Sequence, residues 1–266
     1  MGILDGKKAL IFGVANDHSI AWGIAKAFHE QGATVGFSSI SELLERRVKP
    51  LAQSIGSTFA EPCDVQKDED IANVFAKWQA QYGTLDILVH SLAFANREDL
   101  ATSFVNTSRD GFKMALEISA YSLVALTRAA LPLMHAGSSV MTMTYYGAEK
   151  VMPHYNVMGV AKAALEASVR YMAYDLGAQG IRVNAISAGP IRTLAASGIA
   201  GFRTMYGKFK EVVPLRRSTT IEDVGGTAVW LASDLSSGTT GATIYVDSGA
   251  NILAMVSPEE MAATGA

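Results

Sequence analysis

The fold is decided near the amino end by residues 8–23, which read KALIFGVANDHSIAWG. The apolar run over residues 8–14 is typical of a buried strand, and the pattern over residues 20–31 is typical of a helix. Between them, Gly13, Ser19 and Gly23 place small residues where a backbone can approach a pyrophosphate, beside a helix start that favours an anion. The spacing is looser than GxGxxG, so the stretch alone fits a nucleotide site and an ordinary strand-to-helix turn equally well.

The same strand-then-helix unit recurs along the chain. Further strand candidates are the short apolar runs at residues 34–38, 57–62, 85–91, 139–144, 182–187 and 243–246. Helical patterns separate them at residues 42–54, 68–81, 110–134, 155–176 and 221–232, with helix ends expected at Gly32, Gly56, Gly83 and Gly177. This alternation predicts an α/β fold of Rossmann type, a doubly wound seven-stranded parallel sheet with helices on both faces. No linker interrupts the repeat, so we expect one dinucleotide-binding and catalytic domain over residues 1–266.

Residues 192–214 depart from this repeat. They follow the sixth strand candidate and combine a string of small residues at 195–198 with the apolar Ile199, Phe202 and Met205. An insertion at the carboxyl end of a strand in such a sheet lies beside the ligand crevice, so we expect a substrate-binding lid. The alternative is a surface helix pair that only helps to close the core.

Composition argues against several other classes of protein. Lys and Arg number 22 against 25 Asp and Glu, a net charge of -3, which leaves no excess of positive charge for a nucleic-acid backbone. Cys63 is the single cysteine, which excludes an intrachain disulfide, and the 5 histidines show no metal-ligand spacing. Residues 9–15 fit a first strand better than a signal peptide, and no stretch approaches the ~20 apolar residues of a membrane span. We therefore expect a cytoplasmic protein with no metal site and no nucleic-acid or membrane partner.

Two more strand ends complete the expected crevice. Asp64 follows the third strand candidate, where its carboxylate can accept a hydrogen bond from an adenine amino group or can instead cap the next helix. Ser91, Leu92 and Ala93 close the fourth strand and are expected to lie under the cofactor. Both positions favour a dinucleotide over an ordinary turn.

Tyr155 and Lys162 are the candidate catalytic pair. They are seven residues apart in the helical pattern, about 700° around a helix, so both side chains are expected on one face. A phenol can donate a hydrogen bond to a carbonyl oxygen that becomes an enolate, and an ammonium can hold ribose hydroxyls. Because such pairs are common, the interpretation depends on the surroundings. Tyr145 brings a second phenol to the end of the fifth strand, and the turn at residues 188–193 can offer backbone partners to a nicotinamide and Thr193 to the pyrophosphate.

Over residues 6–254 the sequence resembles the enoyl-acyl carrier protein reductases, a divergent branch of the short-chain dehydrogenase/reductase superfamily. The motifs that carry the resemblance are YNVMGVAK at 155–162, with six residues between Tyr and Lys where the superfamily usually has three, YYGAE at 145–149, and RVNAISAGPIRTLAASG at 182–198.

The resemblance implies the last reductive step of the bacterial fatty acid elongation cycle. NADH delivers hydride to C3 of a trans-2-enoyl thioester on acyl carrier protein, Tyr155 hydrogen-bonds the thioester carbonyl, and protonation at C2 completes the saturated chain. Lys162 holds the nicotinamide ribose, and Tyr145 positions the substrate. NADH is the implied cofactor, with NADPH as second choice, and the implied assembly is a homotetramer.

The resemblance also implies contact residues. Those implied for the cofactor are Gly13, Ala15, Ser19, Ile20, Asp64, Val65, Ser91, Leu92, Ala93, Lys162, Ile191 and Thr193. Those implied for the substrate are Ala95, Tyr145, Tyr155, Ala195, Ala196, Ile199 and Phe202. Four cations near the lid are candidate docking charges for an acidic carrier, with a solvated surface as the alternative: Arg192, Arg203, Lys208 and Lys210.

The chain departs from the family pattern at two places. Ala93 stands where many members carry Gly, which adds a methyl group to the crevice floor. At the second place, Ser39 and Ile40 stand where NADH-using members commonly carry a polar amide side chain. The second strand ends in FSSIS, residues 37–41, which also lacks an acidic residue for the ribose of NAD and an immediate Arg for the 2′-phosphate of NADP, so cofactor choice is weakly specified. Arg46 and Arg47 are expected on a solvated helix face.

Two other functions stay open at this stage. One is a short-chain dehydrogenase or ketoreductase acting on a β-ketoacyl thioester, in which Thr142, thirteen residues before Tyr155, imitates the usual serine. The other is a non-catalytic dinucleotide-binding regulator, since a fold does not fix a function.

Overall fold

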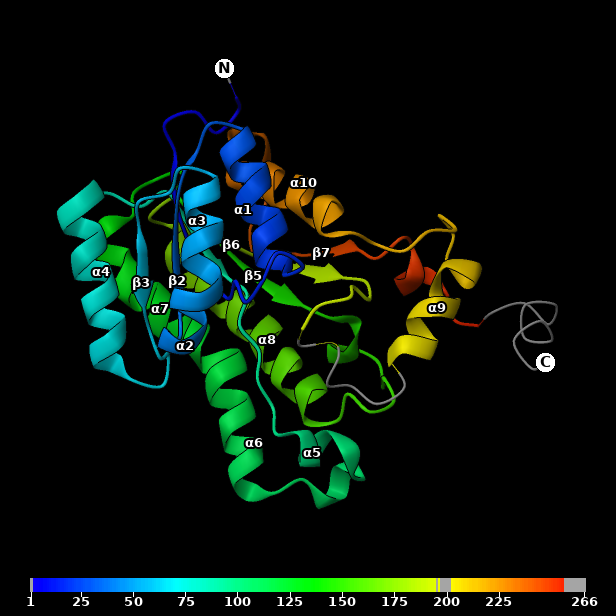
Figure 1. Cartoon of the computed structure of the whole chain (residues 1–266). Helices are drawn as coiled ribbons and strands as arrows, with labels where there is room; N and C mark the ends of the chain where they lie inside the picture. Colours follow the sequence, from blue (N-terminus) through cyan, green and yellow to red (C-terminus); the bar gives the residue numbers. More distant parts are fainter. Residues whose placement is uncertain (1, 195, 197–201, 256–266) are drawn as a thin grey trace.

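The computed structural model describes residues 2–194, 196 and 202–255, and Figure 1 shows the whole chain. Within that part, seven parallel strands form one sheet in the order β3-β2-β1-β4-β5-β6-β7. They are β1 (Lys8–Phe12), β2 (Thr34–Ser39), β3 (Ala60–Pro62), β4 (Ile87–His90), β5 (Ser139–Thr144), β6 (Arg182–Ala188) and β7 (Thr243–Val246). The doubly wound, seven-stranded parallel sheet expected from the sequence is therefore confirmed.

The strand order reverses between β1 and β4. From β1 the chain winds outward through β2 to β3, and it then returns to the other side of β1 and continues from β4 to β7. Phe12 pairs with His90 at the carboxyl ends of these two central strands. In open parallel sheets the ligand crevice lies at such a switch point, outside the carboxyl ends of the strands.

Helices cover both faces of the sheet (Figure 1). The longer ones are α1 (Ile20–Glu30), α4 (Asp68–Tyr82), α6 (Arg109–Leu116), α7 (Ser122–Ala130), α8 (Val157–Gly177), α9 (Phe202–Val212) and α10 (Ile221–Ala232). Shorter helical pieces are α2 (Ser41–Leu43), η1 (Leu44–Val48), α3 (Lys49–Ser54), α5 (Arg97–Ala101), η2 (Phe104–Asn106), η3 (Glu117–Tyr121), η4 (Leu131–Leu133), η5 (Tyr146–Ala148), η7 (Asp234–Ser236) and η8 (Ala250–Ile252). The segments η1 and η3 are π-helical.

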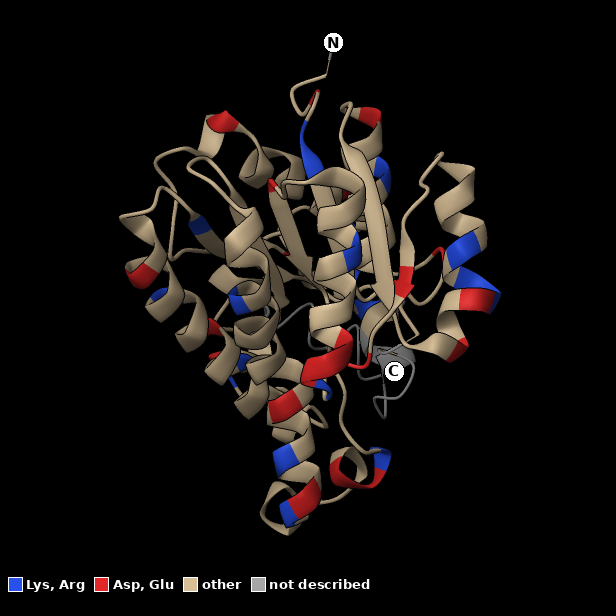
Figure 2. Ribbon diagram, turned by 90° about the vertical axis from the view of Figure 1, so that its left-hand side faces the viewer, with Lys and Arg blue, Asp and Glu red and all other residues tan. Residues whose placement is uncertain are grey.

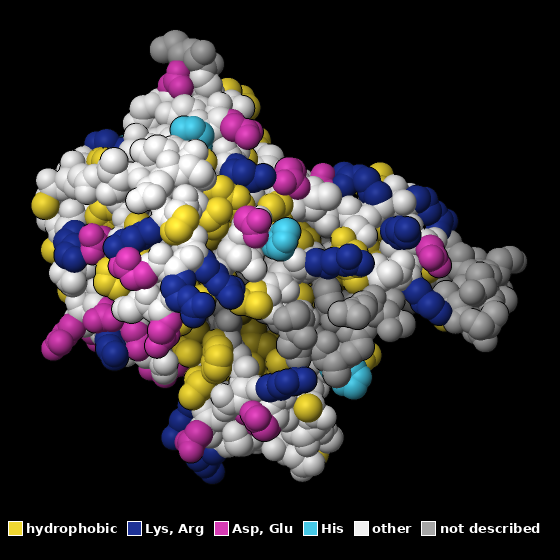
Figure 3. Space-filling model, in the orientation of Figure 1, with side chains coloured by type: hydrophobic (Ala, Val, Ile, Leu, Met, Phe, Trp, Pro, Cys, Tyr) yellow, Lys and Arg dark blue, Asp and Glu magenta, His cyan; other side chains and the backbone are white. Residues whose placement is uncertain are grey.

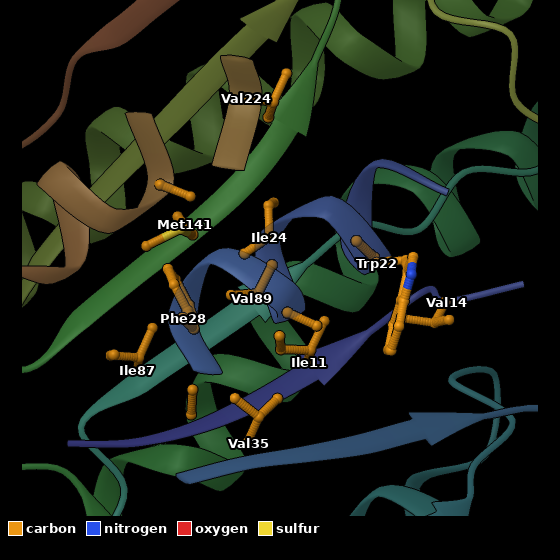
Figure 4. Close-up of a cluster of buried hydrophobic side chains, with 14 of the residues drawn as sticks. Ile11, Val14, Trp22, Ile24, Phe28, Val35, Ile87, Val89, Met141 and Val224 are labelled. Carbon is orange, nitrogen blue, oxygen red and sulfur yellow. The ribbon is translucent and has the colours of Figure 1, made fainter. Parts of the chain in front are cut away.

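Alternation along β1 divides the core into two layers. Ile11 packs with Ile24 of α1 and Val224 of α10 on one face, the cluster drawn in Figure 4. Leu10 and its alternate neighbours face the helices α4, α7 and α8 on the other. Gly23 lets α1 and α10 approach closely, because a β-carbon on it would lie 2.5 Å from the carbonyl oxygen of Ile221.

Two expected helix boundaries are wrong. The helix expected from residue 155 begins only at Val157, and Tyr155 lies in a preceding turn in which His154 and Asn156 have φ values of 64° and 42°. Gly177 is the last residue of α8 rather than its terminator, and the positive φ, 72°, falls on Gly180. Gly32, Gly56 and Gly83 do end helices with positive φ, as expected.

One helical run, Arg109–Leu133, is long and apolar enough to cross a membrane by length and composition alone. Half of its most apolar window is buried inside the molecule. In the described part of the chain α7 contacts α4, α8 and β4, which is the packing of a core helix.

Candidate active site

Tyr145 and Tyr155 lie together at the carboxyl end of β5. Their ring centroids are 4.9 Å apart and the ring planes meet at 75°, an edge-to-face contact. Tyr145 directly follows β5, and the next element, η5, packs against α8. A β-carbon on Gly147 of η5 would lie 2.5 Å from Cδ1 of Tyr155, so the Tyr155 ring rests on a bare backbone.

Both phenols are protonated at neutral pH. Burial raises the pKa of Tyr145 to about 12. Burial raises the pKa of Tyr155 further, and the neighbouring Tyr145 adds to that rise. Each tyrosine can therefore act as a hydrogen-bond donor, and neither carries charge in the resting site.

Lys162 is a buried cation fixed to β5. Its Nζ donates a hydrogen bond to the carbonyl oxygen of Met143 at 2.8 Å, two residues before Tyr145. Burial lowers the pKa of Lys162 to about 8, and the carboxylate of Glu166 acts in the opposite direction. Glu166 lies one turn further along α8 and accepts a hydrogen bond from Thr144 Oγ1 at 2.7 Å. Sequence reasoning missed Glu166, although its spacing of four from Lys162 in a helix was a signal for it.

The glycine turn after β1 is built for close approach of another group. Gly13 has a φ of 107°, and a β-carbon on it would lie 2.0 Å from the carbonyl oxygen of Ser91. Ser19 Oγ accepts hydrogen bonds from the N–H groups of Ala15 and Asn16, both at 3.0 Å. No side chain caps the first turn of α1, which begins at Ile20. The Trp22 N–H donates to the Ser19 carbonyl oxygen at 2.9 Å, so the N–H groups that can meet an anion are those of Ile20 and Ala21.

Asp64 does not cap the helix that follows it. The N-cap of α4 is Lys67, and it has no side-chain cap, so that alternative reading of Asp64 is wrong. Asp64 Oδ1 accepts a hydrogen bond from the Gln66 N–H at 3.1 Å, and its own N–H donates to Asp70 Oδ2 at 2.9 Å. These bonds fix the loop after β3, while Val65 packs against the core under α4.

The loop after β4 lies beside the glycine turn. Ser91 faces the glycine turn, Leu92 packs against the core, and Ala93 is exposed. Ser119 Oγ accepts from the N–H of Phe94 at 3.0 Å and lies 3.2 Å from its carbonyl oxygen, which fixes the chain just before the half-buried Ala95.

The residues after β6 are placed only in part. Ile191 is buried, and Thr193 Oγ1 accepts a hydrogen bond from the Ala196 N–H at 3.1 Å. Ala195 and Ile199 lie outside the described residues. Phe202 is the first residue of α9, and its side chain also lies outside the described part.

The solvated helix face expected for Arg46 and Arg47 after β2 is confirmed. Ser38 and Ser39 are buried, Ile40 is exposed, and Arg46 and Arg47 are exposed on η1.

No group of three or more potential metal ligands occurs among the described residues.

Thr142 belongs to a buried polar chain that also contains His90 and Ser122. His90 Nδ1 lies 2.8 Å from Thr142 Oγ1, and His90 Nε2 lies 2.7 Å from Ser122 Oγ. Because Ser122 Oγ donates to the Ile118 carbonyl oxygen, it accepts from Nε2–H, and Thr142 donates to Nδ1. Burial, and then the charge of Lys162, lower the pKa of His90 to about 3. Thr142 is fully buried with its hydroxyl engaged, which argues against its serving as the serine of a ketoreductase.

A switch-point crevice, a glycine turn and a Tyr-Lys site together define a dinucleotide-dependent oxidoreductase. A family model described as enoyl-(acyl carrier protein) reductase matches residues 13–251. The chain is 51% identical over 261 residues to the NADH-dependent enoyl-acyl carrier protein reductase of Aquifex aeolicus, covering 98% of this chain and 97% of that protein. It is 53% identical over 252 residues to the same enzyme of Rickettsia felis, with 95% and 97% covered.

Solved structures agree. The Bacillus cereus enoyl-acyl carrier protein reductase, in complex with NADP+ and indole naphthyridinone, superposes with a TM-score of 0.94 at 51% identity over 96% of this chain and all of that one. The reductase of Anaplasma phagocytophilum with NAD gives 0.92 at 52% identity over 96% and 98%. The chain belongs to the NADH-dependent enoyl-acyl carrier protein reductases, oxidoreductases of fatty acid biosynthesis.

Proposed function

We propose that this chain reduces the trans-2 double bond of an enoyl thioester with Tyr145, Tyr155 and Lys162 as its catalytic residues. The observation that carries this proposal is Lys162, a buried ammonium that donates a hydrogen bond to Met143 of β5. Met143 lies two residues before Tyr145, whose ring contacts that of Tyr155. A fixed cation near two hydrogen-bond donors suits a carbonyl oxygen that gains negative charge during the reaction.

The residues at the switch point fit a dinucleotide. Gly13 leaves no room for a side chain, and α1 presents uncapped N–H groups beside it. When bound, NADH supplies the hydride that adds to C3 of the substrate. We propose that Lys162 holds the ribose hydroxyls and that the other contacts come from Gly13, Ala15, Ser19, Ile20, Asp64, Val65, Ser91, Leu92, Ala93, Ile191 and Thr193.

Tyr155 acts as the donor to the substrate. Its phenol O–H donates a hydrogen bond to the thioester carbonyl oxygen, and this bond strengthens as charge accumulates on the enolate oxygen. Tyr145 lies edge-on against the Tyr155 ring and restricts where that ring can lie, which positions the substrate. The saturated thioester forms when C2 is protonated.

We propose that the described part of residues 192–214, namely 192–194, 196 and α9, belongs to a lid over the acyl chain, and that Ala95 lies beside it in the substrate site. The face in Figure 3 is hollowed between the body of the molecule and the α5–α6 projection, and hydrophobic side chains gather in the hollow, as an aliphatic ligand requires. Leu215 N donates to the Ser248 carbonyl oxygen at 3.2 Å, which ties the end of this segment to the chain after β7.

The substrate is carried on acyl carrier protein, which docks near α9. Lys208 and Lys210 lie on α9, and Arg192 stacks on the Tyr206 ring at 4.5 Å, so cations gather on this side (Figure 3). Elsewhere both signs of charge alternate over the helices, as Figure 2 shows for one side of the molecule. The excess of positive charge near α9 would orient an acidic carrier protein.

We further propose one catalytic domain that assembles as a homotetramer in the cytoplasm. The leucines of α7 and α8 are buried in the core, whereas Tyr171 and Tyr174 on α8 are 76% and 87% exposed. Two large aromatic side chains left exposed on a long helix support contact with a second copy.

The test is the loss of absorbance at 340 nm with trans-2-enoyl thioesters, given NADH and NADPH in parallel, and with a β-ketoacyl thioester as control. We expect turnover with the enoyl substrate and NADH. In Tyr155→Phe turnover should fall while NADH binding persists, and Tyr121→Phe, at an exposed position, serves as the control that leaves both unchanged. Turnover of the ketoacyl substrate alone would establish a ketoreductase, and NADH binding without either turnover would establish a regulator.

A further inference from the structure

Asn156, the residue after Tyr155, has a backbone conformation that most residues avoid. Its φ is 42° and its ψ is -121°, and the Met158 N–H donates to the Tyr155 carbonyl oxygen at 3.0 Å. These angles are those of the first central residue of a type II′ turn, a position that favours Gly and, less strongly, Asn. The tight turn ends where α8 begins and sets the direction from which Tyr155 enters the site.

The side chain of Asn156 binds the end of a separate helix. Its Nδ2 lies 2.7 Å from the carbonyl oxygen of Thr102, 3.2 Å from that of Asp99 and 3.3 Å from that of Leu100. The last carbonyl groups of a helix lack partners within it, so α5 offers a cluster of free acceptors and Asn156 supplies the donor. The contact joins positions more than 50 residues apart in the chain.

The helix α5 is itself fixed. Asp99 is buried, and its Oδ1 accepts a hydrogen bond from the Ser108 N–H at 2.8 Å. Ser108 Oγ in turn caps α6 by accepting from the Gly111 N–H at 3.0 Å. A β-carbon on Gly111 would lie 1.8 Å from Asp99 Oδ2, so α5 is packed directly on the backbone of α6. Asn156 therefore binds a rigid support.

We infer that Asn156 is a positioning residue for Tyr155: its amide holds the tyrosine turn against α5 and so sets where the phenol O–H points. The inference rests on the proposed function of Tyr155. Gly147 limits the ring on one side, and the Asn156 contact fixes the backbone from which the ring extends. Loss of the amide should misplace the hydroxyl relative to the substrate carbonyl without altering the glycine turn that binds the cofactor.

Two substitutions separate the amide from the backbone requirement. Asn156→Gly keeps the turn accessible but removes the donor, and Asn156→Asp keeps the side-chain size but sets a carboxylate oxygen among three carbonyl oxygens. Asn106→Asp makes the same exchange at an exposed position between α5 and α6 and is the control. We expect both Asn156 variants to lose about tenfold to a hundredfold in kcat, since a displacement near 1 Å can cost that much. The Kd for NADH, measured by fluorescence, should stay within about twofold.

A double-mutant cycle distinguishes positioning from general destabilisation. If Asn156 acts through Tyr155, then Asn156→Gly should cause no further loss of kcat in the Tyr155→Phe background. A loss of equal size in both backgrounds, or a kcat of Asn156→Gly within twofold of the unaltered chain, would overturn the inference.

Hydrogen exchange tests the contact independently of the reaction. The amide protons of Met158 and Gly159 close the turn, so they should exchange faster in Asn156→Gly and Asn156→Asp than in Asn106→Asp. Unchanged exchange refutes the Asn156 contact even if the enzyme is active. Faster exchange in a chain that reduces no enoyl thioester leaves the contact standing and refutes the proposed function instead.

Discussion

Gly147 and Tyr155 are in direct contact, and the contact leaves no space for a methyl group: a β-carbon on Gly147 would lie 2.5 Å from Cδ1 and 3.0 Å from Cε1 of the Tyr155 ring. The same added atom would approach Tyr145 Cδ1 to 3.3 Å. Gly147 therefore determines the distance between η5 and both phenols.

We expect Gly147→Ala to lower kcat for the enoyl substrate by about tenfold to a hundredfold, because the Tyr155 ring must move away from its position. Steady-state rates at saturating NADH measure this effect. Gly226→Ala is the matched control, since a β-carbon on Gly226 meets nothing within 4 Å and Ala favours the helix. A kcat for Gly147→Ala equal to that of the control would mean that the ring position is not critical.

The contact also shows what sequence reasoning could and could not reach. The doubly wound parallel sheet and the close-approach turn at Gly13 could be predicted from periodicity and turn chemistry, because both are local properties of the sequence. Tyr155 was expected on the face of a helix, but it lies in the turn before α8. A helical-wheel argument cannot detect the positive φ of His154 and Asn156, which depends on partners distant in the sequence.

Thr142 illustrates a second limit. Spacing alone allowed it to imitate the serine of a ketoreductase, and only the pairing of β4 with β5 brings it opposite His90. The direction of a hydroxyl depends on which acceptor the fold places beside it. Likewise Asn156 gains its significance from carbonyl groups on α5, so its contribution was not apparent from the sequence.

The activity should fall on the alkaline side as Lys162 loses its proton. Its pKa is lowered from an ordinary value of 10.5 to about 8, so the ammonium is present below about pH 8 and is lost above it. We expect kcat/KM for NADH to decline with rising pH around this value, since that parameter reports the free enzyme. In Glu166→Gln the decline should begin at lower pH, because the carboxylate that favours the charged lysine is gone. Asp175→Asn, an exposed change on the same helix, should not move the profile.

The same lowered pKa has the opposite consequence for stability. The unfolded chain keeps the Lys162 proton up to about pH 10.5, whereas the folded chain releases it from about pH 8. Between these values the unfolded state binds more protons, so this group's contribution to the free energy of unfolding rises with pH. Urea unfolding at several pH values should show that the Lys162→Met variant lacks this rise, and an identical slope in both chains would contradict the buried-lysine assignment.

His90 should make the fold sensitive to acid. Its pKa is lowered from 6.5 to about 3, so the folded state keeps it neutral while the unfolded chain takes up a proton below about pH 6.5. Its contribution to stability is therefore complete above pH 6.5 and is lost as the pH falls toward 3. His29→Gln, at an exposed position, is the control, and His90→Gln should show a weaker decline in urea-unfolding free energy from pH 7 to pH 5.

Thr142→Val tests the same buried chain without changing a charge. It leaves His90 Nδ1 without its donor, which should cost about 1–3 kcal/mol of unfolding free energy. We expect kcat to stay within about twofold, because the Thr142 hydroxyl is directed at His90 and not at substrate. A selective loss of kcat at unchanged stability would return Thr142 to the catalytic role that the buried contact argues against.

Gly13→Ala should abolish NADH binding because two constraints coincide at this position. The φ of 107° disfavours any side chain, and the added β-carbon would lie 2.0 Å from the Ser91 carbonyl oxygen, which cannot withdraw without disturbing β4.

Gly83→Ala separates these constraints, since Gly83 has a φ of 75° but a β-carbon on it would meet nothing within 4 Å. It should lower the stability by about 1 kcal/mol and leave the Kd for NADH unchanged. Fluorescence titration with NADH, together with circular dichroism to confirm that both variants fold, measures the difference. If folded Gly13→Ala binds NADH as tightly as Gly83→Ala does, then the approach of β1 to β4 is a packing requirement alone and the dinucleotide lies elsewhere along the sheet edge.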